Sequence, residues 1–297
     1  MPPDDPARVT LVITTHDRHE YLEEALGSAR AQTYGAVDLV VADDGSTDPR
    51  LLRLLERIEA DGVRVLRCPP RGVSATLNSA FASTEGTYVM RLDDDDVIAP
   101  AYIEQAVRAA ASDPRIGVVY CRAELFGTEE GPWSLPDLDL GALLIDNQVF
   151  ATALFRREDW RAVGGYDESM REGREDHDFL LKVLGLGREV HRLEGTYFRY
   201  RRHDGPSLNA VTGRSTPAKA RAYAAMLRNN QALYVEHAEE FWLHVFRQLE
   251  EARDLRLRYR HLEQLRRRWP RLYGAARTGR RTAEHLAGRL RRDRSPR

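Results

Sequence analysis

The sequence is poor in cysteine and contains no long apolar segment. Cys68 and Cys121 are the only cysteines among 297 residues, so no disulfide framework is indicated and a reducing compartment is expected. No apolar run approaches the roughly 20 residues that a membrane-spanning helix needs. Residues 1–6 are neither basic nor apolar, unlike a signal peptide. We therefore expect a cytoplasmic protein.

The chain also lacks a net charge of either sign, but its charges are unevenly distributed. The formal net charge is −1. From Glu251 onward there are 16 arginines and five acids, near +11, which leaves the first 250 residues near −12. No nucleic-acid-binding motif accompanies the arginines, so we expect no nucleic-acid partner. Length and composition fit one large globular domain with an appendage.

The hydrophobic pattern alternates between strand-like and helix-like segments over the first 120 residues. Such an alternation predicts a doubly wound, mostly parallel α/β sheet. The expected strands are 9–14, 39–42, 63–66, 87–90 and 116–120, and the expected helices are 19–32, 49–58, 72–81 and 100–111.

Four consecutive aspartates, Asp93–Asp96, directly follow the strand 87–90. Like charges at this spacing repel one another, and a packed core does not accept them. The carboxyl ends of strands are where open α/β sheets bind ligands. Aspartate oxygens there suit Mg²⁺ or Mn²⁺, either of which can hold a diphosphate. A solvated acidic turn is the alternative.

Two further acidic clusters stand at the ends of expected elements, one after a strand and one before a helix. Asp43 and Asp44 end the strand 39–42 and precede a glycine that permits close backbone approach. Residues 175–178, Glu-Asp-His-Asp, precede the apolar helical segment 179–184. Acids are also favoured at helix N-termini by the helix dipole, so capping is an alternative for the second cluster.

These clusters carry a resemblance to a known family. Segments 12–18, 41–48, 92–96, 164–168 and 175–180 resemble, in order and spacing, the motifs of family 2 glycosyltransferases of the GT-A fold. The resemblance covers roughly residues 9–208. It implies a Rossmann-like catalytic domain over 1–212, with the nucleotide-sugar mainly at 9–121 and the acceptor and base region at 122–212. A helical, Arg-rich C-terminal extension over 213–297 would follow.

The resemblance also implies residues that bind the sugar donor. Asp44 would accept a hydrogen bond from N3–H of uracil or thymine, which suits a carboxylate because it only accepts. Many relatives have Ala-Arg-Asn where this chain has Thr76-Leu77-Asn78, so an arginine often directed at the donor is missing. His16 replaces the usual tyrosine. The donor-binding residues implied are Thr14, His16, Asp44, Asn78, Asp93 and Asp94.

The same resemblance implies a divalent metal, Mn²⁺ or Mg²⁺, and a catalytic base. Asp95 would coordinate the metal and His203 would contact the metal or the diphosphate, while Arg201 and Arg202 could offer charge to phosphate. Asp176 corresponds to the general base that removes the proton of the acceptor hydroxyl in an inverting transfer.

The expected function is therefore a metal-dependent, inverting transfer of sugar from a nucleoside-diphosphate sugar, most simply a UDP-sugar, to a hydroxyl acceptor. A nucleotidyltransferase is one alternative, although it would carry a Gly-rich basic loop after the first strand and residues 14–18 do not form one. A non-catalytic sugar-nucleotide-binding or scaffold protein is another. Donor hydrolysis by the purified protein would discriminate against the latter.

Two regions lack a clear pattern or a clear role. Residues 124–146 interrupt the expected sheet and form either an acceptor loop or a passive surface excursion. Residues 218–234 and 241–268 read as helices, and the second carries an apolar stripe (Val245, Leu249, Ala252, Leu255, Tyr259, Leu262 and Trp269). We expect the stripe to pack on its own domain; a homodimer contact, or a peripheral membrane contact of the basic segment 277–297, is the alternative.

Overall fold

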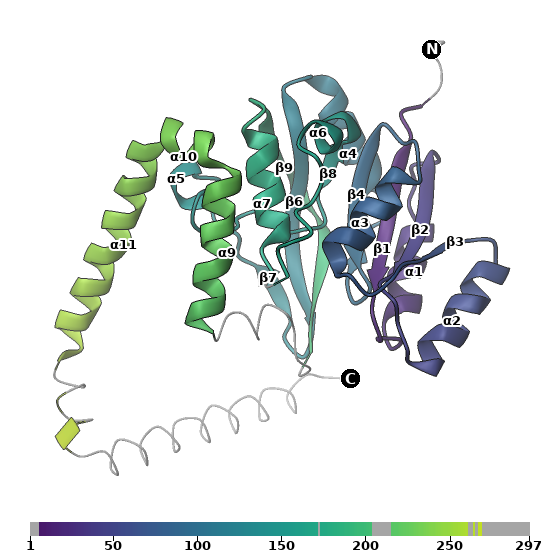
Figure 1. The fold of residues 1–297 in the computed structure, drawn as a ribbon, viewed down its shortest axis with the longest axis horizontal. Helices are drawn as coiled ribbons and strands as arrows, with labels where there is room; N and C mark the ends of the chain where they lie inside the picture. Colours follow the sequence, from purple (N-terminus) through teal and green to yellow (C-terminus); the bar gives the residue numbers. More distant parts are fainter. Residues whose placement is uncertain (1–5, 172, 204–214, 261–263, 265–266, 269–297) are drawn as a thin grey trace, which may run out of the picture. The chain divides into compact units, whose positions relative to one another are not determined.

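The structure is a computed structural model that describes residues 6–171, 173–203, 215–260, 264, 267 and 268. The chain divides into two compact units, residues 1–241 and residues 242–297. The first unit contains the sheet, its covering helices and the acidic clusters (Figure 1).

A single mixed sheet runs through the first unit, in the order β3-β2-β1-β4-β8-β6-β9-β5, with β7 paired to β6. The strands β3, β2, β1 and β4 are mutually parallel, and β6 and β9 are parallel to each other. The strands β8, β5 and β7 run antiparallel to their neighbours. The bounds are β1 Val9–Thr15, β2 Val37–Asp43, β3 Arg64–Arg67, β4 Tyr88–Asp93, β5 Val97–Ile98, β6 Ile116–Gly127, β7 Gly131–Trp133, β8 Leu154–Arg156 and β9 Glu189–Arg202.

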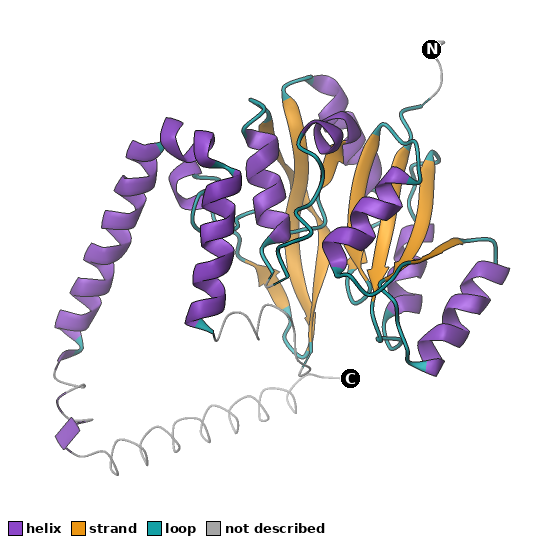
Figure 2. Cartoon of the chain, viewed as in Figure 1, coloured by secondary structure: helices purple, strands orange, loops and turns teal. Residues whose placement is uncertain are grey.

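Helices cover both faces of this sheet, with α3 and α7 on the near face in the view of Figures 1 and 2. The start of α2 illustrates how sequence sets an element: Asp48 caps it by accepting from the Arg50 N–H, and Pro49 occupies its first position. The bounds are α1 Leu22–Arg30, α2 Pro49–Ala60, α3 Val73–Ala82, α4 Tyr102–Ser112, α5 Leu140–Leu143, α6 Arg157–Ala162, α7 Glu175–Leu184, α9 Thr216–Asn229, α10 Gln231–Glu236 and α11 Ala238–Arg258.

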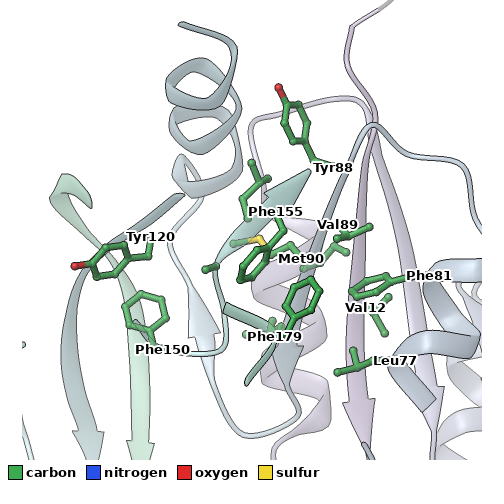
Figure 3. Close-up of a cluster of buried hydrophobic side chains, with 14 of the residues drawn as sticks. Val12, Leu77, Phe81, Tyr88, Val89, Met90, Tyr120, Phe150, Phe155 and Phe179 are labelled. Carbon is green, nitrogen blue, oxygen red and sulfur yellow. The ribbon is translucent and has the colours of Figure 1, made fainter. Parts of the chain in front are cut away.

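The core beneath α3 and α7 fixes the ends of these helices relative to the sheet. Leu77 and Phe81 of α3 and Phe179 of α7 are fully buried with Met90 of the central strand (Figure 3). The rings of Phe155 and Phe179 meet edge to face with centroids 4.8 Å apart. Each such side chain contributes about 1.5–3 kcal/mol by burial, so the N-terminus of α7 is held in a defined position.

The α/β sheet expected from the sequence is confirmed, but its second half differs from the expectation. The strand β6 continues to Gly127, because β9 pairs with it along its whole length, and β7 adds a hairpin to it. The start of the segment 124–146 is therefore part of the sheet. The single helix expected over 218–234 is broken at Asn230, whose side chain donates to Asp178 of α7.

The residues of the apolar stripe belong to the second unit, residues 242–297. No residue of Ala238–Arg258 is buried, and Leu249, Leu255 and Tyr259 are more than half exposed. The expectation that the stripe packs on its own domain stays a prediction. Leu262, Trp269 and the segment 277–297 lie outside the described residues. Within the described residues, no helix is both long and apolar enough to span a membrane.

Candidate functional site

The carboxyl ends of β1 and β2 carry two loops that are tied together by Asp17. Its carboxylate accepts hydrogen bonds from the backbone N–H groups of Thr47 (2.6 Å) and Asp48 (2.8 Å). Asp17 itself adopts a left-handed backbone (φ 50°), which aspartate tolerates better than most residues. Beside it, His16 is exposed and its Nδ1 lies 3.0 Å from the Asp44 carbonyl oxygen. The two loops therefore form one rigid rim.

Asp44 points across this rim to the start of α3. Its Oδ1 accepts from the N–H of Arg71 and of Gly72 and from Thr76 Oγ1 (2.9 Å), whereas its Oδ2 accepts only from the Gly72 N–H (3.0 Å) among the contacts described. Oδ2 thus keeps acceptor capacity for a ligand N–H. The adjacent Asp43 is buried and accepts from the Ser46 N–H, so Asp43 forms the turn.

Two of the four aspartates Asp93–Asp96, at the end of β4 and just after it, are buried and hold the loop. Asp94 Oδ2 accepts from Thr15 Oγ1 at 2.6 Å, and burial raises the pKa of Asp94 to about 7. Asp96 accepts from the N–H of Arg201 in β9 at 2.9 Å, and burial raises its pKa well above the usual range. Asp96 therefore links the loop to β9 and does not cap α4.

Asp95 stands beside two nitrogen groups. His203 Nε2 lies 3.2 Å from Asp95 Oδ2, and Arg18 Nη1 contacts the same oxygen. Among the described residues, no three His, Cys, Asp or Glu side chains are grouped as for a metal. A carboxylate and an imidazole nevertheless fit Mn²⁺ as two protein ligands, if diphosphate oxygens and water complete the shell.

Asp93 connects this loop to the third acidic cluster through a buried arginine. Arg91 has a side chain only 7% exposed; its Nη2 donates to Asp93 Oδ1 at 2.7 Å and its Nη1 donates to Glu175 Oε1 at 3.1 Å. Thr14 Oγ1 donates to the same Asp93 oxygen at 3.4 Å. The expected donor residues Thr14, Asp93 and Asp94 are therefore brought together, and the start of α7 is joined to them.

Asp176 is the residue of α7 that stays partly exposed beside this arginine. Its Oδ2 accepts from Asn147 Nδ2 at 2.9 Å. Desolvation raises the pKa of Asp176, since burial disfavours the charged carboxylate. The preceding Arg174 has a left-handed backbone (φ 73°) that turns the chain into the helix. Asp176 thus presents a hydrogen-bonded carboxylate with raised basicity.

The next two residues of the cluster point into the protein. His177 is buried; its Nε2 bonds to the Leu143 carbonyl, and burial lowers its pKa to about 4. Asp178 is buried, pairs with Lys182 Nζ at 2.8 Å and accepts from Asn230 Nδ2 at 2.9 Å. Both residues fix α7 against its neighbours and neither is available to a substrate.

Asn78 is not brought to the acidic clusters by the hydrogen bonds described. Its Nδ2 donates to the Tyr166 carbonyl (2.9 Å), and its Oδ1 accepts from the Tyr166 N–H and from Trp160 Nε1. A Cβ on Gly165 would lie 2.5 Å from that Oδ1, so glycine is required there. Asn78 therefore joins α3 to the turn after α6, and its contact with the donor stays a prediction.

The sequence analysis did not identify two supporting residues, Arg91 and Asn147, and it did not predict the contacts of Arg201. Arg201, expected near phosphate, lies between the rings of Tyr21 and Phe126 (4.3 and 4.2 Å to the centroids) and its Nε donates to the Asp95 carbonyl. This hydrogen bond holds the backbone of the loop that carries Asp95. Arg91 had a sequence signal, a charge inside an otherwise apolar strand, whereas Asn147 had none.

The fold and the acids at its edge define the class of protein. The structure is similar to residues 1–349 of TarS from S. aureus in complex with UDP-GlcNAc, with a TM-score of 0.58 and 17% identity over 79% of this chain and 78% of that chain. It is also similar to the mannosyltransferase PcManGT from Pyrobaculum calidifontis in complex with GDP-Man and Mn²⁺, with a TM-score of 0.53 and 19% identity over 89% and 88% of the two chains. The fold is therefore that of the GT-A glycosyltransferases.

Sequence comparison gives the family. The model of glycosyl transferase family 2 matches residues 10–166, and the chain belongs to that family. It is 27% identical over 219 residues to the O-antigen biosynthesis protein RfbC of Myxococcus xanthus and 23% identical over 209 residues to the hyaluronan synthase of Pasteurella multocida. These matches span 71% and 68% of this chain but only 17% and 21% of those proteins. The expected family and fold are confirmed.

Proposed function

We propose that the protein transfers a sugar from a UDP-sugar to a hydroxyl acceptor with inversion, using a divalent metal and Asp176 as the base. The supporting observation is one connected arrangement: Arg91 joins Asp93 of the metal motif to Glu175, and Asp176 stands next to Glu175 with a partly exposed carboxylate. Arg91 thus links a residue expected to bind the donor to the residue next to the proposed base.

The donor nucleotide would lie on the rim formed by the loops after β1 and β2. His16 and Thr14 would line the base, and Asp44 Oδ2 would accept the N3–H of uracil. Adenine offers no ring N–H at its Watson–Crick edge, only an exocyclic amine, so this acceptor favours uracil. Asp93 and Asp94 would reach ribose or sugar hydroxyls, as their position beside Thr14 and Thr15 allows.

Asp95 and His203 would hold the metal, Mn²⁺ or Mg²⁺. When bound, the metal supplies positive charge to the departing diphosphate, so that the leaving group needs no proton. The complex of PcManGT with GDP-Man and Mn²⁺ supports the use of a divalent metal. Arg201 keeps the Asp95 backbone in place through its carbonyl (2.8 Å).

Asp176 would take the proton of the acceptor hydroxyl. Its pKa is raised by desolvation, and a carboxylate becomes a stronger base as its pKa approaches the working pH. Asn147 donates to one oxygen of Asp176 and so leaves the other oxygen to accept the proton. No covalent intermediate is needed, so the configuration at the anomeric carbon would be inverted.

The acceptor would lie along the region 122–212, beside the hairpin of β6 and β7. Trp133 of β7 is half-buried, and its ring centroid lies 4.8 Å from that of Tyr200 in β9. Burial raises the pKa of Tyr200, and the nearby charges of Asp96, Asp93 and Asp95 raise it further. We take these aromatic side chains near the acidic loop as support for an acceptor that would approach there.

Calorimetric titration of the protein with nucleotide-sugars in the presence of Mn²⁺ tests the donor assignment. We expect UDP-GlcNAc and UDP to bind more tightly than GDP-Man and ADP. A preference for ADP would contradict the role given to Asp44, and a preference for GDP-Man would contradict the choice of uracil, because guanine also carries a ring N–H.

A further inference from the structure

Arg18 lies where a divalent ion would have to bind. It follows β1, and its Nη1 contacts Asp95 Oδ2 and lies 3.4 Å from Asp94 Oδ1. His203 Nε2 is 3.2 Å from that same Asp95 oxygen. The side chains of Asp94 and Asp95 are only 9% and 16% exposed, so the ion pairs are shielded from water. A protein cation therefore neutralises the carboxylate that is assigned to the metal.

This arrangement opposes a metal ion that arrives alone. The ion must compete with Arg18 for Asp95 Oδ2, and it then lies next to an arginine that has lost its partner, in a poorly hydrated place. A diphosphate removes this cost, because its oxygens are acceptors for the arginine fork as well as ligands for the metal.

We propose that Arg18 is a built-in counter-ion that makes metal binding conditional on the nucleoside diphosphate. Without nucleotide it occupies Asp95; when the metal and the diphosphate enter together, it transfers its hydrogen bonds to the phosphate oxygens. This rests on the proposed function only in taking Asp95 as the metal ligand. Because binding couplings are reciprocal, the metal and the diphosphate each raise the affinity for the other.

Removing the guanidinium should therefore have effects of opposite sign on two ligands. Arg18→Gln should bind Mn²⁺ alone more tightly than the wild type, because no cation competes for Asp95. It should bind UDP in the presence of Mn²⁺ more weakly, because a phosphate contact is lost. We expect the factor by which UDP raises Mn²⁺ affinity to fall about 5- to 150-fold, the usual range of such couplings.

Mn²⁺ binding is measured by the electron paramagnetic resonance of free Mn²⁺, with and without UDP, on the full chain. The matched control is Arg115→Gln: Arg115 also lies between two carboxylates, those of Asp113 (2.7 Å) and Glu189 (3.0 Å). Arg115 precedes β6, which runs parallel to β4. It therefore lies at the amino ends of these strands, whereas Asp95 lies at the carboxyl end of β4. Arg115→Gln should leave both affinities unchanged.

The outcomes separate the two proposals. If the wild type binds Mn²⁺ with UDP, but Arg18→Gln shows the same affinity for Mn²⁺ alone, the role of Arg18 is refuted and the proposed function stands. If the wild type binds no Mn²⁺ even with UDP, the metal assignment and the role of Arg18 are both refuted. The wild type alone can also refute the proposal, so the test does not depend on a variant that folds. If Mn²⁺ binds the wild type equally tightly with and without UDP, the proposal is overturned.

Discussion

The clusters Asp93–Asp96 and 175–178 have similar composition but are built on different elements, and each exposes only part of its polar groups. In the first, Asp94 and Asp96 are buried and hold the loop, while Asp93 and Asp95 remain more accessible. In the second, only Asp176 stays partly exposed, since its neighbours face the interior at the start of α7. In each cluster, therefore, the exposed acidic residues are available to a ligand and the buried residues hold the loop or helix in place.

Arg91 joins the two clusters, because its Nη2 donates to Asp93 and its Nη1 donates to Glu175. Substitution of the exposed residues of the two clusters should reduce sugar transfer, and substitution of the buried residues should reduce the stability of the fold.

The largest expected effect is that of Asp176→Asn. Asparagine keeps the size of aspartate but cannot take a proton, so transfer or donor hydrolysis should fall by about 10²–10⁴-fold, with UDP-sugar affinity retained in calorimetry. The matched control, Asp178→Asn, alters the buried pair with Lys182 and should reduce stability rather than turnover per folded molecule. Near-normal turnover in Asp176→Asn would remove this residue from the chemistry.

Arg91→Met should be the most destabilising single change, because it leaves Glu175 buried without its partner. Loss of one member of a buried ion pair typically costs about 3–5 kcal/mol, which urea unfolding would measure. The double variant Arg91→Met with Glu175→Gln should recover part of this loss. Unfolding midpoints equal to the wild type for the single variant would contradict the bridging role.

His177 should make stability depend on pH. Burial lowers its pKa to about 4 from the ordinary 6.5, so between these values the unfolded chain binds a proton that the folded chain does not. Stability should therefore fall by roughly 3 kcal/mol as the pH drops from about 7 to about 4, at 1.36 kcal/mol for each unit. Comparison of unfolding curves for the wild type and His177→Gln at pH 7, 5.5 and 4 isolates this contribution; parallel losses in both proteins would exclude it.

Asp44→Ala should have the smallest of these effects on function; it also removes the acceptor of the Arg71 and Gly72 N–H groups and of Thr76 Oγ1, so stability is measured alongside UDP affinity. Loss of one hydrogen bond to the base is expected to cost about 1–3 kcal/mol of UDP affinity. Asp48→Ala serves as the control: it removes the cap of α2 and should cost about 1 kcal/mol of stability, with UDP affinity unchanged. Equal losses of UDP affinity in both variants would show that the rim, rather than Asp44, sets affinity.

The sequence was most informative where structure is local. The alternation of strands and helices from β1 to α4 follows from segments such as Val9–Thr15 and Pro49–Ala60, whose own residues favour strand and helix. The order of the acidic motifs identified the family. The pairing of β6 with β9 could not be predicted, since it joins residues far apart in the chain. The contacts of Asn147 and Asn78 likewise depend on tertiary packing.

The most direct test of the central claim is the anomer that the enzyme first releases. With an α-configured UDP-sugar and no acceptor, water activated by Asp176 should attack the face opposite the diphosphate. Time-resolved proton NMR of UDP-GlcNAc hydrolysis with Mn²⁺ should then show β-GlcNAc before mutarotation sets in, and no such signal with Asp176→Asn. Initial release of the α-anomer by the wild type would contradict a single displacement and the role of Asp176 with it.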